Sequence, residues 1–328
     1  MKTLNLKVGD PQYMKPFWDQ QKIINVKFRS ECFYPQNWDD LNRHIAKLHK
    51  NIHNIDINPD HIVYGNGASQ LVSAAVSALT DKATSPQLTV KMSAPYWRRI
   101  PSLMAIGAKQ PAVILSEDYG DIHFVTSPNN PDGVVSGDID VADIVDACYN
   151  WPQYTALPLS TAMRPINIYG IAKAVGLAGL RFGWAIVPDN HLRDRMREYI
   201  DLTTAGVSTL VQERVYCTMV YINNLILDKK QTPFQYAAEV LDTRWSRTIE
   251  AFNKTGIKIS NPRQGMFLWL YSTDGIDLPK LLLDKYGIIC MTGAECGIDN
   301  SFARISLGCT DDEFNDFIKR IETNHSSS

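Results

Sequence analysis

The sequence lacks several features that would point to particular classes of protein. No stretch approaches the roughly 20 consecutive apolar residues that a membrane-spanning helix needs. Neither sign of charge dominates, because 33 basic and 35 acidic residues, interspersed along 328 positions, leave a formal charge of −2. This balance argues against nucleic acid or an acidic membrane surface as the partner, and it favours a small molecule.

Cysteine and histidine give no sign of a metal site or a disulfide framework. The six cysteines are scattered without a CxxC pair, which is typical of reduced core residues. His44, His49 and His53 fall on polar positions of one expected helix and its end, with no carboxylate or cysteine at ligand spacing. From this spacing we expect no bound metal. The N-terminal 20 residues contain no apolar run of secretory length, so we expect a cytoplasmic protein.

Short β-branched runs alternate with helical or turn-rich segments between about residues 60 and 190. The seven runs are HIVYG, LTVKM, PAVIL, IHFVT, DIVDA, PINIYG and GWAIV. This rhythm predicts an α/β fold with a mostly parallel seven-stranded sheet covered by helices. Long helical patterns follow over 191–228 and 234–253, and then strands and helices alternate again to the C-terminus. We place a large domain at 30–230 and a small α+β domain at 1–29 and 231–328.

One lysine stands among small and apolar residues in YGIAKAVGLAGLRFGW, residues 169–184. Desolvation of Lys173 would favour its neutral amine, a nucleophile that forms Schiff bases with carbonyls. Arg181, eight positions later, has the planar charged fork that suits a phosphate. Taken alone, a lysine in such a glycine-rich loop is usually an ordinary solvated lysine. Together the two residues indicate a phosphorylated aldehyde cofactor.

A turn of small residues follows the strand HIVYG and leads directly into an apolar helix. Gly67, Ala68 and Ser69 stand at the start of that helix, where unpaired backbone N–H groups and the helix dipole attract a phosphate. Ser69 on its own is compatible with a simple N-cap. With Arg181 as a second ligand, a phosphate site is the better interpretation.

Polar side chains follow two expected strands at their carboxyl ends, where open α/β sheets bind ligands. Asn130 lies in the turn after IHFVT, and Asp146 is the fourth residue of DIVDA, in an otherwise apolar run, with Tyr149 three residues on. A buried carboxylate is costly unless it is paired, and a protonated pyridinium nitrogen would pair with Asp146 and make the ring an electron acceptor. Asn130 and Tyr149 would then share the phenolic oxygen of the ring.

Two further side chains complete the predicted site. Tyr96, in SAPYWRR, offers a flat face on which a ring can stack, with Trp97 as the alternate; each is also compatible with ordinary core packing. Arg304 stands inside the apolar strand SFARISLG. An arginine there grips a carboxylate, either a structural one or the α-carboxylate of an amino acid.

Seven motifs in order resemble the fold-type I pyridoxal-phosphate enzymes, and most closely the alliinase and plant tryptophan aminotransferase branch of the class I/II aminotransferases. They are GDP (9–11), GNGASQ (65–70), APYW (94–97), SPNNPDG (127–133), DACYNWPQY (146–154), AKAVGLAGLRFGWA (172–185) and FARISLG (302–308). The resemblance implies the fold-type I transferase architecture and pyridoxal 5'-phosphate as cofactor.

The resemblance also implies roles for individual residues. Lys173 would form the internal aldimine, Asp146 would pair with the pyridinium nitrogen, and Arg304 would bind the substrate carboxylate. The other implied ligands are Asn130 and Tyr149 for the phenolic oxygen, Tyr96 for stacking, Gly67, Ala68, Ser69 and Arg181 for the phosphate, and Asn130 and Gly9 for the substrate. Members are usually homodimers with interfacial active sites, so Tyr34 of the neighbouring subunit is a further substrate-binding candidate.

The chain departs from the family pattern beside the lysine. A hydroxyl residue is usual three positions before the lysine, and serine is common immediately before it, but here these are Gly170 and Ala172. One phosphate hydrogen bond is therefore missing, with Tyr169 or Asn66 as candidate replacements. The segment between Gly133 and Asp146 is also shorter than usual, so we expect a trimmed surface helix.

These features favour an aminotransferase that moves an amino group from an L-amino acid to a 2-oxo acid. Lys173 would act as the base at Cα, and Asp146 would stabilise a quinonoid intermediate. A β-eliminating C–S lyase, as in alliinases, is the alternative, and a ligand sensor that borrowed the fold is a weaker one. Phe17, Trp18 and Phe267, with Phe33 and Tyr34, are compatible with an apolar substrate pocket or with core packing.

Overall fold

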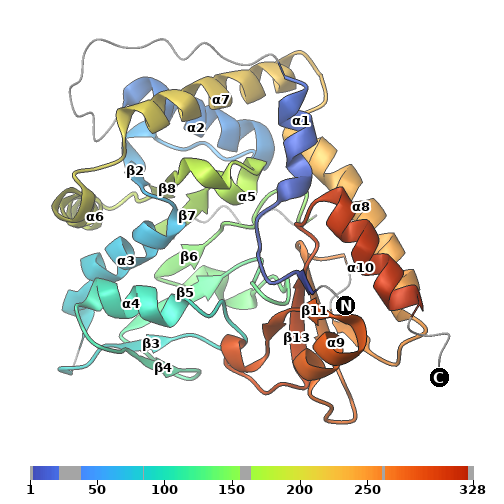
Figure 1. The fold of residues 1–328 in the computed structure, drawn as a ribbon. Coiled ribbons are helices and arrows are strands. Elements are labelled where there is room, and N and C mark those ends of the chain that lie inside the picture. Colours follow the sequence, from blue (N-terminus) through green and yellow to red (C-terminus); the bar gives the residue numbers. More distant parts are fainter. Residues whose placement is uncertain (1–2, 22–37, 84, 156–163, 261–262, 324–328) are drawn as a thin grey trace.

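The computed structural model describes residues 3–21, 38–83, 85–155, 164–260 and 263–323. A central sheet of seven strands occupies the middle of the molecule (Figure 1), in the order β2-β8-β7-β6-β5-β3-β4. β8 is antiparallel to both of its neighbours, and all other pairs are parallel. The mostly parallel α/β sheet expected from the sequence is therefore confirmed. Its strands are β2 (Ile62–Gly65), β3 (Thr89–Lys91), β4 (Ile114–Ser116), β5 (Ile122–Thr126), β6 (Ile144–Asp146), β7 (Ile166–Gly170) and β8 (Gly183–Ile186).

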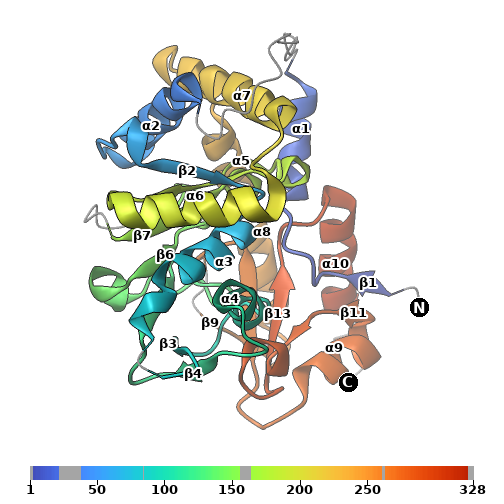
Figure 2. The ribbon, with the colours of Figure 1, turned by 90° about the vertical axis from the view of Figure 1, so that its left-hand side faces the viewer.

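Helices cover both faces of this sheet, which is why its strands are apolar on both sides. On one face α3 (Ala68–Leu79) contacts α4 (Ile100–Ala108) and α6 (Asn190–Thr204), as Figure 2 shows. On the other lie α2 (Asp39–His53), α7 (Thr209–Leu227) and the short α5 (Ile171–Val175). Successive strand residues enter separate cores: Ile168 packs in the core beneath α3, and Tyr169 in the larger core opposite.

A smaller antiparallel sheet follows in the C-terminal part, in the order β12-β13-β10-β9. Its strands are β9 (Lys258–Ser260), β10 (Phe267–Tyr271), β12 (Met291–Thr292) and β13 (Phe302–Ser306), accompanied by α8 (Pro233–Phe252), α9 (Leu278–Tyr286) and α10 (Asp311–Thr323). The N-terminal β1 (Leu4–Asn5) pairs in parallel with β11 (Ile288–Ile289), and α1 (Lys15–Asp19) follows it. The N-terminal residues thus join the C-terminal sheet region, while the domain boundaries at 30 and 230 stay a prediction.

Two expected elements prove to be divided. The helical pattern over 191–228 forms α6 and α7, because Ala205 and Gly206 adopt positive φ angles of 52° and 91° that end α6. The run GIICMT forms two short strands, β11 and β12, which pair with different sheets. Short 3-10 helices stand at Gln12–Met14, Pro59–His61, Thr80–Lys82, Gly137–Val141, Ala178–Leu180 and Ala294–Cys296.

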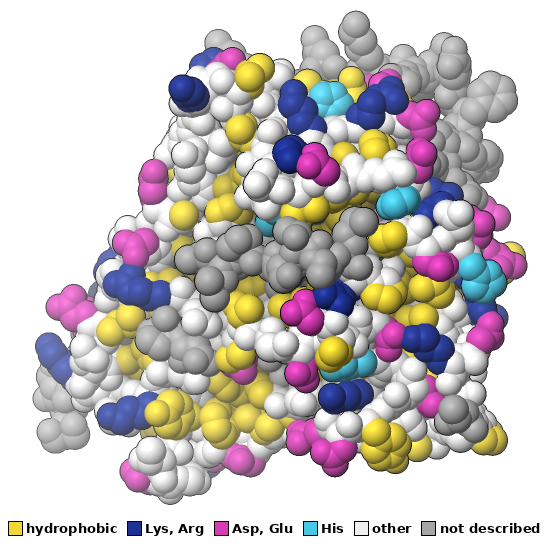
Figure 3. Space-filling view, turned by 180° about the vertical axis from the view of Figure 1, so that it is seen from behind, with side chains coloured by type: hydrophobic (Ala, Val, Ile, Leu, Met, Phe, Trp, Pro, Cys, Tyr) yellow, Lys and Arg dark blue, Asp and Glu magenta, His cyan; other side chains and the backbone are white. Residues whose placement is uncertain are grey.

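The surface gives no single-sign electrostatic face on the side seen from behind. Figure 3 shows basic and acidic side chains interspersed there, as the balanced composition predicts. Of the helices in the described ranges, none combines the length and the apolar character that a membrane crossing requires.

Candidate active site

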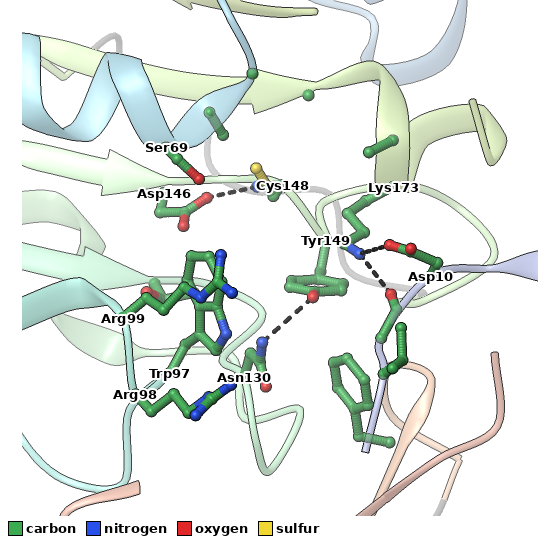
Figure 4. A pocket seen from close by; sticks show the side chains of 18 of the residues that line it. Asp10, Ser69, Trp97, Arg98, Arg99, Asn130, Asp146, Cys148, Tyr149 and Lys173 are labelled. Atoms are coloured by element: carbon green, nitrogen blue, oxygen red, sulfur yellow. Dashed lines mark hydrogen bonds and ion pairs between the residues drawn. The ribbon is translucent and has the colours of Figure 1, made fainter. Parts of the chain in front are cut away.

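A pocket of about 510 Å³ lies where the carboxyl ends of the central strands meet the N-terminal segment and the small sheet. Its walls come from residues 5–10, the start of α3, the turn at 97–99, the ends of β5, β6 and β7, and single residues of β10, β12 and β13. Figure 4 shows that side chains from these distant segments converge on one space. This is the edge at which ligands bind in open α/β sheets.

Lys173 reaches into this pocket from α5, just after β7. Its Nζ donates a hydrogen bond to the Gly9 carbonyl and lies 3.6 Å from Asp10 Oδ1 (Figure 4). Tyr154 donates to the Lys173 carbonyl over 3.0 Å, which fixes the backbone that carries the amine. Burial lowers the pKa of Lys173, and the Asp10 carboxylate offsets part of that shift. The amine is therefore more readily deprotonated than an exposed lysine.

Asp146 ends β6 and faces the same pocket, and it is only 7% exposed. Its Oδ1 accepts a hydrogen bond of 3.1 Å from the Cys148 backbone N–H. Burial raises the pKa of the Asp146 carboxyl, while the hydrogen bonds from Cys148 act in the opposite direction. In the described part of the chain no ion pair with Asp146 is formed, so this buried acceptor faces the pocket with only the charge of the more distant Lys173 acting on it.

A chain of polar contacts crosses the pocket from the large sheet to the small one. Asn130 Nδ2 donates to the Tyr149 hydroxyl over 3.3 Å, and Arg304 Nη1 donates to Asn130 Oδ1 over 2.7 Å. Arg304 also donates to the Lys7 carbonyl over 2.6 Å and stacks on the Phe267 ring at 4.1 Å. Its Nε, although buried, has no hydrogen-bond partner among the described residues, so the guanidinium keeps a free donor there.

Burial changes the acid–base behaviour of Tyr149 and Arg304, the two groups at the ends of this series of contacts. It raises the pKa of the Tyr149 hydroxyl well above its ordinary value, so the phenol is neutral. It lowers the pKa of the Arg304 guanidinium, although an arginine keeps its charge. A neutral hydroxyl beside a charged fork suits a ligand that carries both an oxygen acceptor and a carboxylate.

The opposite end of the pocket has the features of a phosphate site. Gly67, Ala68, Ser69 and Arg181 all line it, at the N-terminus of the 12-residue helix α3. Gly67 has a φ of 82°, and a Cβ there would lie 2.8 Å from Arg181 Nη2. The guanidinium therefore packs directly against the turn that exposes the backbone N–H groups of α3.

Neither proposed replacement for the missing hydroxyls faces the pocket. Asn66 Nδ2 instead donates to Gln70, Thr204 and the Gly206 carbonyl. The Tyr169 ring is buried in a cluster with His49, Trp151 and Trp184. Gly170 and Ala172 do line the pocket, so this wall of the phosphate site carries no side-chain donor at either position.

Of the two adjacent aromatics, Trp97 lines the pocket and Tyr96 does not, so the alternate rather than our first choice has a position from which it could stack on a ring. The Tyr96 ring lies against Gly297 instead, 2.8 Å from where a Cβ would stand. Phe267 lines the pocket, whereas Trp18 donates its indole N–H to the Val175 carbonyl and Phe17 packs on Trp18 and Tyr236. Tyr34 and Phe33 lie outside the described residues.

Gly9 has the expected place, beside both the lysine and the arginine. A Cβ on Gly9 would lie 3.0 Å from Phe267 Cζ and 3.9 Å from Arg304 Nη2, so any larger residue here would press on the Phe267 ring. Sequence reasoning missed Asp10, Cys148, Arg98 and Arg99, which also line the pocket. Asp10 stood within the GDP motif, and that motif was the only available signal for it.

The donor set fits a phosphorylated pyridine aldehyde. Asp146 presents a buried acceptor without an ion pair among the described residues, Lys173 presents an amine with a lowered pKa, and the start of α3 presents backbone N–H groups beside Arg181. Each of these groups matches one functional group of such a molecule: the ring nitrogen, the aldehyde and the phosphate.

Comparison with known proteins gives a consistent result. A protein-family model described as Allinase matches residues 4–325. Tryptophan aminotransferase-related protein 2 of Arabidopsis thaliana is 29% identical over 367 aligned positions, covering 100% of this chain and 82% of that protein. An alliin lyase of Allium cepa var. aggregatum is 27% identical over 274 positions, covering 75% of this chain and 61% of the lyase.

Solved structures share the fold. An aspartate aminotransferase from Thermotoga maritima superimposes with a TM-score of 0.75 at 20% identity, covering 99% of this chain and 92% of that one. An aromatic aminotransferase from Pyrococcus horikoshii gives a TM-score of 0.76 at 16% identity, covering 98% and 95%. At these identities the likeness establishes the fold alone.

Proposed function

This chain belongs to the allinase family, whose members use pyridoxal phosphate, and from that premise we propose that it is an aminotransferase. It moves an amino group from an L-amino acid to a 2-oxo acid. The observation that carries the proposal is the meeting of Lys173, Asp146 and Arg304 in one pocket. An amine, a buried carboxylate and a carboxylate-binding fork are what such a reaction requires.

Each side chain has a definite task in this proposal. Pyridoxal phosphate, when bound, supplies an aldehyde and an electron-accepting ring. Asp146 pairs with the ring nitrogen, Tyr149 and Asn130 hold the phenolic oxygen, and Trp97 covers one face. Ser69, Arg181 and the α3 N-terminus hold the phosphate.

Arg304 and Lys173 act on the substrate itself. Arg304 binds the α-carboxylate and so fixes the direction of the Cα–H bond. Lys173 would take the proton from the substrate Cα and return it to the carbon of the aldehyde group that the bound cofactor supplies. The lowered pKa of Lys173 supports this role, because a base must be unprotonated when it acts.

The extent of the similarities favours transamination over elimination. Three tryptophan aminotransferase-related relatives align with 97–100% of this chain and two more with 75%, whereas the alliin lyases align with 63–75% of it. A β-eliminating C–S lyase is the second candidate, since the same Cα proton removal precedes loss of a sulfur leaving group.

Incubation of the pure enzyme with single amino acids tests the choice. We expect no turnover until a 2-oxo acid is added, and then a stoichiometric exchange of amino and oxo groups. Release of pyruvate and ammonia from a cysteine derivative alone, with no acceptor present, would instead establish the lyase.

We also propose a cytoplasmic homodimer with active sites at the subunit interface. The family resemblance supports the dimer. Light scattering on the purified holoenzyme tests the first: a monomeric mass at micromolar concentration would contradict it. A fluorescent fusion of the full chain tests the second, and accumulation in any organelle would contradict it.

A further inference from the structure

The pocket holds one carboxylate to which the proposed function gives no task. Asp10 lines the cavity from the N-terminal segment, two residues before the short 3-10 helix Gln12–Met14. Its Oδ1 lies 3.6 Å from Lys173 Nζ, and the same amine donates a hydrogen bond to the neighbouring Gly9 carbonyl (Figure 4). Two successive residues of one segment therefore meet the amine, each with an acceptor.

The backbone of this segment is fixed at the point from which Asp10 reaches the amine. The Gln12 N–H donates to the Asp10 carbonyl over 2.9 Å and to the Gly308 carbonyl over 2.6 Å. A Cβ on Gly308 would lie 2.5 Å from the Asp10 carbonyl oxygen, so the two backbones touch. These contacts use the backbone of Asp10 alone, and a substitution of its side chain leaves them in place.

Within the described ranges, Asp10 is the only carboxylate at ion-pair distance from Lys173. The ionisable side chains whose charges act on the amine are Asp10 from the N-terminal segment, Asp146 and Cys148 from the end of β6 and the turn after it, and Arg304 from β13. Burial raises the pKa of the Cys148 thiol well above its ordinary value, so the thiol is neutral. Asp146 is the more distant carboxylate, and its task is at the ring nitrogen.

The protonation of the free amine depends on a balance in which Asp10 has one side. Burial lowers the pKa of Lys173, and repulsion from Arg304 acts in the same direction. The Asp10 carboxylate acts in the opposite direction, because an anion stabilises the ammonium form. The Asp10 side chain is 51% exposed, so water screens part of its charge and its effect is moderate. Moderate stabilisation suits an amine that must both gain and lose a proton.

We propose that Asp10 is a positioning residue that holds the free Lys173 amine as an ammonium group beside the Gly9 carbonyl, between removal of the substrate Cα proton and its return. One proton moves, from Cα to the amine and back to carbon, and no bond to Asp10 is formed or broken. The inference rests on the proposed function for the moment at which the amine becomes free. The contact between Asp10 and the amine does not depend on that reaction.

Trace acetylation of the cofactor-free full chain measures the amine without turnover. The probe is isotopically labelled acetic anhydride, which reacts with the neutral amine only, and mass spectrometry of the Lys173 peptide follows the reaction over a pH series. We expect Asp10→Asn to lower the pH midpoint of Lys173 acetylation by about 0.5 to 1 unit, so that below the midpoint the variant reacts roughly three- to tenfold faster. Asp10→Glu keeps the charge and should restore most of the wild-type midpoint.

Asp19 supplies a matched control carboxylate. It lies on α1 in the same N-terminal part of the chain, is 59% exposed and pairs with Lys15. Asp19→Asn should therefore leave the midpoint of Lys173 acetylation unchanged. Circular dichroism of each variant verifies that the fold is retained.

Steady-state kinetics connect the contact to turnover. In Asp10→Asn the acid limb of the kcat profile should move toward lower pH by the same amount as the acetylation midpoint, with KM nearly constant, because Asp10 contacts the base rather than the substrate. A fall in kcat with the limb unmoved would assign Asp10 a merely structural role and overturn the inference.

The outcomes separate this inference from the proposed function. An acetylation midpoint in Asp10→Asn equal to that of the wild type overturns the inference even if transamination is observed. A lowered midpoint that Asp10→Glu restores, in a protein that transaminates no donor, supports the contact and overturns the proposed function.

Discussion

The buried and the exposed ends of the pocket are built by different means. Asp146, Asn130, Tyr149 and Arg304 are each no more than 7% exposed and are joined or faced by protein groups, whereas Arg181 at the phosphate end is exposed and Ser69 is half-buried. The buried end fixes orientation, because its groups cannot rotate without losing hydrogen bonds. The exposed end contributes attraction, and water competes there with each contact.

Under the proposed function, this difference leads us to expect the chemistry at the buried end and the retention of the cofactor at the exposed end. Substitutions at the first should change rate constants, and substitutions at the second should change the dissociation constant of the cofactor. The predictions below separate the two, in order of decreasing effect.

Replacement of Lys173 is expected to have the largest effect. Lys173→Ala removes both the carbonyl-reactive amine and the base, so kcat should fall by at least about 10³-fold. The fold should persist, because the contacts to Tyr154 and Gln153 use backbone carbonyls of α5 rather than the amine. Activity with circular dichroism checks this. A rate near that of the wild type would remove Lys173 from the mechanism.

Asp146→Asn should lower kcat by roughly 10²-fold, because the neutral amide no longer favours a protonated ring nitrogen. The same change should stabilise the cofactor-free protein at neutral pH. Burial raises the pKa of Asp146 in the folded state, so the wild type loses stability as pH rises through that pKa, and the variant does not.

Thermal unfolding across a pH series measures this second effect. The variant should melt roughly 2 °C higher at neutral pH, and the difference should vanish at acidic pH, where the wild-type carboxyl is protonated. A difference that is constant with pH would mean that the carboxylate charge is not its cause.

Gly170→Ser is expected to have the smallest effect. It should improve cofactor binding rather than impair the enzyme, because it adds a donor to the phosphate end. A Cβ at Gly170 would lie 3.6 Å from Cys148 Sγ and 3.8 Å from Ala68 Cβ, which are ordinary contacts. One added hydrogen bond to a charged group should tighten cofactor binding by about tenfold. Equilibrium dialysis of pyridoxal phosphate against the cofactor-free enzyme measures it, with kcat expected to stay constant.

A steric control lies on the next strand. At Gly183 a Cβ would stand 2.8 Å from the Ala68 nitrogen and from the Gly67 carbonyl carbon. Gly183→Ser should therefore displace the phosphate turn and weaken cofactor binding. If Gly170→Ser leaves the dissociation constant unchanged, the phosphate does not lie beside Gly170.

Sequence patterns predicted the large sheet well because each strand carries its own signal. All seven β-branched runs became strands, and the side chains at their carboxyl ends, Asn130, Asp146 and Lys173, line one pocket. Local patterns predict local elements, and the general rule for open α/β sheets then brings the strand ends together.

The errors arose where neighbouring residues or distant segments decide the outcome. Tyr96 and Trp97 are adjacent aromatics of similar chemistry, so composition alone could not identify the one that faces the pocket. Asp10 and Arg99 enter the site only because the N-terminal segment and the turn before α4 meet there. No local pattern in the sequence marks that meeting.

The hydrogen bond from Arg304 to the Lys7 carbonyl has a consequence for the order of folding. It joins residues 297 positions apart, and β1 with β11 closes nearly the same loop. Contacts of such long range form late, since the loop must close before they contribute stability. The end of the pocket at Arg304 is therefore expected to form late in folding. A ligand held there binds the finished protein alone and shifts the folding equilibrium toward it by mass action.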